Sequence, residues 1–333
     1  MKRVFNFIVV MGLAAEALVV GQGQDASKVL SLVHEALGGD KKIAAVKTLA
    51  VTGRSAKVNG DSTAPATDFE IAMELPDKYM KKEVVATIGS NTIARTTGFN
   101  GDGLIEAMDT PPSVGGGGMM VMRFGGPGGA APGAQPTPEQ AAEMRKGALQ
   151  AAHADFARLT LGMFASSFSA FPLEFSYAGQ AEAPDGKADV IGIKGDDNFQ
   201  ARLFVDSTSH LPLMLTWMAK EPLMMNVGGP GRGPGGAGAN VVQFGSGAGG
   251  TQQMTPEQRD QMMKDMQERM KDAEANRRTV EYRVYYGDYQ DVSGVKLPFK
   301  LQRSIDGKPT EEMTIEKIKV NQKIDPKKFE VSK

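Results

Sequence analysis

The sequence predicts an α+β fold that is mainly β and built around an antiparallel sheet. First, segments of alternating apolar and polar residues recur along most of the chain, at the roughly 8–12-residue spacing of antiparallel β-proteins. Second, turn sequences such as Asn59-Gly60-Asp61 separate neighbouring segments. Third, helical periodicity is confined to three segments, 25–37, 137–171 and 255–278.

The first 24 residues match a secretory signal peptide. Lys2 and Arg3 supply the positive start, an apolar run extends from Val4 to Ala15, and Ala15-Glu16-Ala17 has the small-x-small pattern of a cleavage site. A membrane anchor would need about 20 apolar residues, and Glu16 interrupts the run too early. We therefore expect residues 1–24 to be cleaved, and residues 25–333 to form a single periplasmic or otherwise exported domain.

The next part of the chain is predicted to form one helix and a meander of strands. Asp25 or Ser27 can cap a helix over 25–37, and Gly38-Gly39 ends it. Beyond it the apolar period changes to two, as in strands with one buried face. The predicted strands span 48–59, 66–75, 78–86, 92–99 and 104–108.

The second half is predicted to contain two helices and seven more strands. Thr137-Pro138-Glu139-Gln140 has the residues of a capping box, and it begins a helical region that extends to about residue 171 with a break near Gly162. Thr255-Pro256-Glu257-Gln258 begins the helix over 255–278 in the same way. The predicted strands span 174–181, 188–194, 199–206, 211–220, 279–289, 295–305 and 310–321.

Two inserts rich in Gly, Pro and Met, 111–136 and 222–254, interrupt the strands. Each contains a Met pair, Gly/Pro-rich chain and a Phe-Gly pair, followed by Thr-Pro-Glu-Gln at the start of a helix. Because this composition does not favour regular elements, both inserts are predicted to be loops, either functional or disordered. The weak repeat suggests two similar flaps on one scaffold.

Composition narrows the possible functions. The 333 residues include 38 basic and 39 acidic side chains, a net charge of -1, which gives no reason to expect nucleic acid or acidic lipid surfaces as the main partner. The absence of Cys excludes disulfides, thiolate metal sites, a cysteine nucleophile and acylation at a cysteine. The unusual feature is the combination of 40 Gly with 20 Met.

No catalytic constellation stands out, and we predict no enzyme activity, no cofactor and no metal site. The three histidines, His34, His153 and His210, lack the spacing of a zinc-protease helix. The glycine-rich stretches lack the Gly-Lys-Ser/Thr of a phosphate cradle. Asp196-Asp197-Asn198 resembles part of a calcium loop but lacks the glycine and the distal glutamate, so a turn is predicted there.

The methionines are the strongest functional signal. Met262, Met263, Met266 and Met270 lie on one face of the predicted last helix, opposite charge pairs such as Asp260–Lys264. Three interpretations remain open: the Met face packs on the sheet, it contacts an apolar ligand, to which the adaptable thioether side chains are suited, or the thioethers bind Cu(I). For the loop methionines, which have fewer packing partners, a mobile apolar lid is preferred.

Several turn and strand motifs resemble those of proteins related to the lipoprotein carriers LolA and LolB, the outer membrane lipoprotein-sorting-like superfamily. The motifs, near both ends of the predicted mature chain, are Ala36-Leu37-Gly38-Gly39, Val46-Lys47-Thr48-Leu49, Thr52-Gly53, Leu75-Pro76-Asp77-Lys78-Tyr79, Gly98-Phe99-Asn100-Gly101-Asp102-Gly103, Tyr286-Gly287-Asp288-Tyr289, Asp291-Val292-Ser293-Gly294-Val295-Lys296-Leu297-Pro298 and Ile324-Asp325-Pro326-Lys327-Lys328-Phe329. Because these motifs form turns and strands, they are more specific for fold than for function.

The resemblance implies a strongly curved antiparallel sheet that forms an unclosed half β-barrel, with helices covering its concave side. In the carriers, that cavity holds lipoprotein acyl chains during transit across the periplasm. The same fold serves envelope-stress sensors and other lipid-responsive proteins. The two inserts lie outside the resemblance and indicate a specialised relative.

We therefore expect an exported protein that binds an apolar ligand (an acyl chain, a lipid or a lipoprotein) in a half-barrel cavity, with a role in lipoprotein transport or sorting. A transient membrane or membrane-protein partner is compatible with this role, and nucleic acid is not expected. The alternatives are a lipid-responsive sensor or interaction protein, and a Met-based Cu(I)-binding protein. The predicted lid and cavity residues are Met119, Met120, Met122, Phe124, Trp217, Met224, Met225, Met262, Met266 and Met270.

Overall fold

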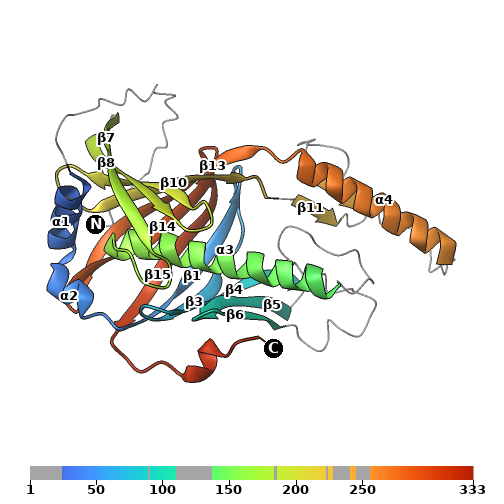
Figure 1. Cartoon of the computed structure of the whole chain (residues 1–333), viewed down its shortest axis with the longest axis horizontal. Coiled ribbons are helices and arrows are strands. Elements are labelled where there is room, and N and C mark those ends of the chain that lie inside the picture. Colours follow the sequence, from blue (N-terminus) through green and yellow to red (C-terminus); the bar gives the residue numbers. More distant parts are fainter. Residues whose placement is uncertain are drawn as a thin grey trace.

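A strongly curved, unclosed antiparallel sheet of 13 strands forms the centre of the structure (Figure 1). The computed structural model describes residues 25–88, 91–109, 137–183, 186–222, 224–227, 241–244 and 256–332. The strand order is β6-β5-β4-β3-β1-β15-β14-β13-β10-β9-β8-β7, with the short β2 beside β1. The α+β, mainly β prediction is thereby confirmed, as is the half-barrel that the resemblance implies.

The strands follow the predicted turns closely. Gly60, Gly101 and Gly307 have φ of 60°, 55° and 73° at the turns that separate them, a conformation that glycine adopts without strain. The N-terminal strands are β1 (Thr48–Asn59), β2 (Ser62–Thr63), β3 (Thr67–Glu74), β4 (Lys78–Ile88), β5 (Asn91–Asn100) and β6 (Gly103–Asp109). The others in the large sheet are β7 (Leu173–Ala183), β8 (Gly186–Gly195), β9 (Gln200–Asp206), β10 (Pro212–Lys220), β13 (Thr279–Val292), β14 (Val295–Ile305) and β15 (Lys308–Val320).

Helix α3 (Pro138–Phe164) covers the concave side of the sheet and links its two edge strands, β6 and β7 (Figure 1). Its predicted capping box is present, since the Thr137 hydroxyl and the Gln140 side chain each accept a hydrogen bond from the other residue's backbone N–H. The helix is shorter than predicted and has no break at Gly162. It ends because Ala165 adopts the left-handed conformation, and Phe168 and Phe171 then form an isolated bridge.

The remaining helices lie around this core. Helix α1 (Ala26–Leu37), capped by Asp25, packs against β7 and β14. The sequence analysis missed α2 (Asp40–Ala44) and the short 3-10 helix η2 (Pro326–Phe329), each of which is a single turn or little more. Among the described residues, no helix combines the length and the apolarity needed to cross a membrane.

The second insert differs from its prediction as a loop throughout. Within it, β11 (Met224–Val227) and β12 (Val241–Phe244) form a parallel pair, separate from the large sheet. Helix α4 (Pro256–Ala275) comes next and extends away from the large sheet beside this pair (Figure 1). Helix α4 does not lie over either face of the large sheet (Figure 1), and among the described elements it contacts β12. The side chains of its Met face lie outside the description, so the three interpretations of that face remain predictions.

The two faces of the sheet carry separate apolar clusters. The larger lies on the concave face beneath α1 and α3, and its largest fully buried side chains include Tyr79, Phe99, Phe156 and Phe164. The smaller lies on the outer face, where the C-terminal segment packs Ile324 and Phe329 against Ala72, Met80 and Ile105. Ser332 then bonds to Leu104 and Glu106, so the chain end covers the free edge of β6.

Two glycines of α3 provide a matched test of how tightly this helix packs. A methyl group on Gly162 would lie 2.1–2.6 Å from ring carbons of the buried Tyr286, whereas one on Gly147 would meet nothing within 4 Å. We expect Gly162→Ala to destabilise the protein by about 1–3 kcal/mol through overpacking, and Gly147→Ala to stabilise it by up to about 1 kcal/mol through helix propensity. Thermal and urea unfolding measure both; equal effects of the two substitutions would contradict this packing.

Candidate ligand site on the concave face of the sheet

The concave face is divided into an apolar end and a charged end. Near the start of β1 and the end of β3, the inward side chains are apolar and buried, as for Leu49, Val51 and Met73. Toward the other end of this face, charged residues occupy the inward phase of β4, β14 and β15, as for Lys81, Arg303 and Glu311. Inward charges are costly unless paired, so this change of character marks a site.

Three tyrosines attach α3 to the sheet. Their hydroxyls donate hydrogen bonds from Tyr79 to the Asp155 carboxylate (2.7 Å), from Tyr286 to the Arg158 carbonyl (2.9 Å) and from Tyr289 to the Gly162 carbonyl (3.1 Å). Burial raises the pKa of all three phenols, well above the ordinary value for Tyr79 and Tyr289. The tyrosines therefore stay neutral donors at any physiological pH, and the helix is held by directional bonds as well as by apolar packing.

The charged end contains seven residues that we call the charged cluster. Strand register places part of it in one row across the sheet, since Arg303 pairs with Glu311, and Glu311 pairs with Lys57. Side chains directly opposite on neighbouring antiparallel strands share a face. The cluster comprises Lys57, Lys81, Glu83, Asp155, Arg158, Arg303 and Glu311.

Glu311 is the most buried acid of the cluster, with 3% of its surface exposed. Its carboxylate accepts hydrogen bonds from the Ser55 hydroxyl (2.5 Å) and the Lys57 ammonium (2.7 Å), and the Arg303 guanidinium lies 3.6 Å away. Burial alone would raise its pKa. The charges of Arg303, Lys81 and Lys57 outweigh burial and lower the pKa to about 2.

Asp155 connects α3 to the cluster. It accepts the hydrogen bond from Tyr79 and lies 3.5 Å from the Arg303 guanidinium. Burial favours its neutral form, but the charges of Lys81 and Arg303 together with the Tyr79 hydrogen bond lower its pKa to about 2. Asp155 and Glu311 in turn raise the pKa of Arg303, against the effect of burial. Asp155 and Glu311 are therefore ionised at neutral pH, and their partners are charged.

Arg158 and Trp217 lie together at the border of the apolar and charged ends. The Arg158 guanidinium carbon is 4.3 Å from the centroid of the Trp217 ring and 5.6 Å from that of Phe199. Trp217 also stacks on Tyr282, with ring centroids 5.4 Å apart and planes at 15°. This cation–π arrangement joins helix α3 to strands β10 and β13.

Both inserts leave the sheet at its charged end. The first begins after β6 ends at Asp109, and the second lies between Lys220 of β10 and Thr279 of β13, which pair with each other. In the antiparallel arrangement this is also the end where β1 and β14 finish. Any residue of an insert that reaches the concave face thus approaches it from the charged end.

Of the predicted lid and cavity residues, Trp217 is the one whose side chain the structure describes, half-buried on the concave face. Met119, Met120, Met122 and Phe124 lie outside the described residues. Met224 and Met225 are placed on β11, and Met262, Met266 and Met270 on α4, but their side chains lie outside the description. Their proposed contacts with a ligand, or with Cu(I), remain predictions.

The sequence analysis missed the charged cluster. A signal was present, because Arg303 and Glu311 occupy the same phase of alternation as the buried Leu301 and Met313 on their strands. A charged residue in the apolar phase of a strand indicates a buried ion pair or a site. Asp155 and Arg158 had no such signal, because the apolar face of α3 is poorly defined in the sequence.

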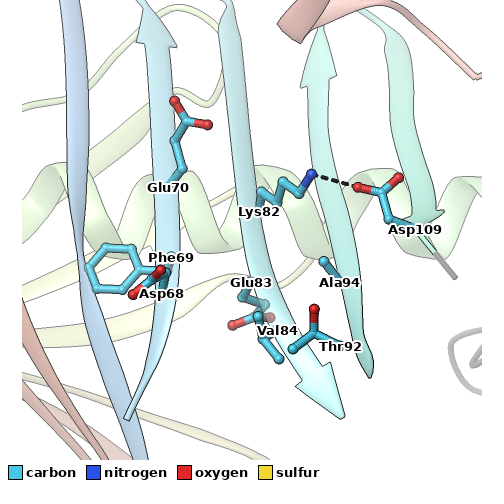
Figure 2. A pocket seen from close by; sticks show the side chains of 9 residues that line it. All are labelled: Asp68, Phe69, Glu70, Lys82, Glu83, Val84, Thr92, Ala94 and Asp109. Atoms are coloured by element: carbon cyan, nitrogen blue, oxygen red, sulfur yellow. Dashed lines mark hydrogen bonds and ion pairs between the residues drawn. The ribbon is translucent and has the colours of Figure 1, made fainter. Parts of the chain in front are cut away.

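A shallow depression of about 310 Å3 lies on the other side of the sheet, over β3 to β6 (Figure 2). Asp68, Glu70 and Lys82 line it, and Lys82 reaches across to the Asp109 carboxylate at 2.5 Å. These residues alternate with the inward-facing Phe69 and Ile71. The depression is open and its lining mixes charged with apolar side chains, and it lies on the opposite face from the apolar cavity that the resemblance implies.

In the part of the chain that the structure describes, no group of three or more His, Cys, Asp or Glu side chains could hold a metal ion. The histidines have separate surroundings: His34 pairs with Asp40 (2.6 Å), His153 packs edge-on against Phe99, and His210 lies in a turn with φ of 56°. The turn predicted at Asp196-Asp197-Asn198 is confirmed, since Asp197 and Asn198 are both left-handed.

No protein-family model matches the chain, and no curated protein matches it. Among solved structures it is similar to a LolA superfamily protein from Nitrosomonas europaea, with 8% identity, a TM-score of 0.43, and 92% of this chain and 98% of that chain covered. A DUF1329 family protein from Desulfovibrio piger has 7% identity and a TM-score of 0.42, with 92% and 98% covered.

A domain from Vibrio parahaemolyticus, described as an outer membrane lipoprotein-sorting protein, has 8% identity and a TM-score of 0.40, with 91% of this chain and 97% of that chain covered. At such TM-scores the likeness extends to the general arrangement of the strands and no further.

Proposed function

We propose that this protein binds an apolar ligand, such as an acyl chain or a lipid, against the concave face of the open sheet. The observation that carries the proposal is the lining of this face. A continuous apolar cluster lies beneath a single long helix, α3, in a sheet that does not close. Each Å2 of apolar surface buried contributes about 25 cal/mol, so a long acyl chain gains binding free energy from its own buried area, less the area that α3 gives up.

Helix α3 is the element that we expect to move. None of its residues from Pro138 to Ala151 is buried, whereas the buried residues begin at Ala152 and continue to Phe164. This less buried half comes directly after the first Met-rich insert. A ligand can therefore enter from the charged end by displacing the first half of the helix, with methionines from the inserts covering the exposed part of the ligand.

The resemblance to lipoprotein carriers extends the proposal to a role in transport or sorting in the envelope. Residues 1–24, which lie outside the described residues, would serve as the signal peptide. A lipid-responsive sensor on the same fold is the main alternative. The two roles differ in the step after binding, because a sensor changes its contact with a membrane partner while a carrier releases the ligand to one.

Native mass spectrometry of the protein purified from the periplasm, with subsequent solvent extraction and lipid analysis, tests the proposal. A reproducible added mass that matches a lipid, an acyl chain or a lipoprotein would support it and identify the ligand class. A ligand-free mass, with no uptake of added phospholipid or fatty acid, would refute it.

The methionines of the inserts give a specific prediction. Changing Met119, Met120, Met224 and Met225 together to Ser should weaken ligand retention by about tenfold or more, because each buried Met contributes on the order of 1.5–3 kcal/mol. The matched control changes the same four residues to Leu, which keeps the apolar surface and should retain the ligand. Circular dichroism should show both variants folded. Equal retention by the Ser and Leu variants would refute the lid.

A further inference from the structure

Arg158 is the cation of the charged cluster for which the described residues supply no acidic partner at contact distance. Lys57 is bonded to Glu311, Lys81 lies 2.8 Å from Glu83, and Arg303 lies 3.5 Å from Asp155. Arg158 contacts aromatic faces, and its Nε, like that of Arg303, is buried with no hydrogen-bond partner in the described part of the chain. Arg158 differs from Arg303 in having no carboxylate within 4 Å among the described residues. A buried donor without a partner is uncommon in folded proteins.

The charge balance of the cluster also indicates that an anion could bind beside Arg158. Within the described part of the chain, its four cations face three carboxylates, so one positive charge has no acidic counterpart in that set. Asp155 is the acid with the largest electrostatic effect on Arg158. However, one of its carboxylate oxygens accepts a hydrogen bond from Tyr79, and the other lies 3.5 Å from the Arg303 guanidinium. Burial lowers the pKa of the Arg158 guanidinium, although Asp155 opposes this. An anion at this position would satisfy the free donors and balance the charge.

The position of Arg158 also suits one end of an elongated ligand. It lies where the apolar lining of the concave face meets the charged row, with the flat stack of Trp217 and Tyr282 beside it. An apolar chain along the lining would bring its own end group to this border. The tail and the head of such a ligand would therefore meet matching surfaces.

We propose that Arg158 binds the anionic head group, a carboxylate or a phosphate, of an amphiphile whose apolar chain lies on the concave face. This inference rests on the proposed function and adds the charge of the ligand to it. Guanidinium donors bind either head group in a bidentate manner. The stack of Trp217 and Tyr282 holds the guanidinium plane in place before the ligand arrives.

Titrations with dodecanoate, dodecyl phosphate and dodecan-1-ol, below their aggregation limits, test the inference. Trp217 is the single tryptophan of the chain, so its fluorescence reports binding beside Arg158, and calorimetry gives an independent affinity. We expect both anionic probes to bind at least about tenfold more tightly than the alcohol, because a hydrogen-bonded charge pair contributes about that much. Arg158→Gln should abolish this preference and leave the affinity for dodecan-1-ol unchanged.

The control variant is Lys300→Gln, which removes one positive charge from an exposed residue on the outer side of β14. It should keep the full preference for the anionic probes. Arg158→Lys retains the charge without the planar fork and should keep part of the preference. If Arg158→Gln does not fold, Arg158→Lys carries the test, and a full preference for the anionic probes in that variant would count against the guanidinium fork.

The outcomes separate this inference from the proposed function. Equal affinity of the wild type for dodecanoate and dodecan-1-ol would overturn the head-group site and leave the apolar site standing. Binding of none of the three probes would overturn both. Inorganic phosphate that binds as tightly as dodecyl phosphate would overturn the amphiphile, because the site would then take a free anion. A preference that survives in Arg158→Gln would assign the head group to another residue.

Discussion

Replacing Phe156 with alanine is expected to lower the free energy of unfolding by about 3–5 kcal/mol, the range for a large side chain removed from a packed core. Phe156 is 1% exposed, and its ring centroid lies 5.4 Å from that of Phe99, 5.8 Å from that of Tyr79 and 5.8 Å from that of Phe168. The cavity would be surrounded by rigid rings that cannot collapse into it. A loss of this size is a large part of the total stability of a typical domain.

The matched control for Phe156→Ala is Lys146→Ala, which truncates an exposed side chain on the same helix and should change stability by less than about 0.5 kcal/mol. Urea unfolding monitored by circular dichroism gives both values. A loss below about 1 kcal/mol for Phe156→Ala would mean that α3 is not packed on the sheet in the free protein. The same variant should bind apolar ligands more readily, since a loosened α3 costs less to displace.

Glu311→Gln is expected to destabilise the protein by about 3 kcal/mol at pH 7, because it leaves the charges of Arg303 and Lys57 without their buried acid. Glu311 has its pKa lowered from the ordinary 4.5 to about 2. An acid with a lowered pKa stabilises the fold when ionised, so its contribution is complete above about pH 4.5 and is lost as the pH falls through about 2. Asp155, lowered from 3.8 to about 2, acts in the same direction.

Unfolding measured between pH 7 and pH 2 tests this assignment. The wild type should lose stability steadily below about pH 4.5, whereas Glu311→Gln should lose less, so the two curves approach each other near pH 2. The control is Glu312→Gln, which changes the adjacent and exposed residue of β15 and should follow the wild-type curve. Parallel curves for wild type and Glu311→Gln across this range would show that the ionisation of Glu311 does not cause the loss of stability at low pH.

Local chemistry made most of the fold predictable. The helix over 25–37 begins at its Asp25 cap and ends at Gly38, as expected from capping alone. Strands were found where apolar residues alternate, and turns where Asn-Gly or Asp-Gly pairs allow positive φ. The end of α3 was not predictable, because the apolar residues that continue to Phe171 pack as a turn after Ala165 and not as helix.

The site was much less predictable than the fold. Glu311 meets Ser55 and Lys57 across more than 250 residues of sequence, and the helix that carries Asp155 and Arg158 comes from a third region of the chain. Trp217 was predicted as a cavity residue, and it lies beside Arg158 on the concave face. Nothing in the sequence pairs those two residues.

By itself, the sequence determined the mainly β class, the turns and the caps, because these depend on interactions between residues a few positions apart. It also marked two Met-rich inserts at the ends of strands. The tertiary structure decided which strands are neighbours, which face α3 covers, and that α4 extends away from the sheet. It alone brought four cations and three acids together, because electrostatic partners are set by distance in space, to which separation along the chain is no guide.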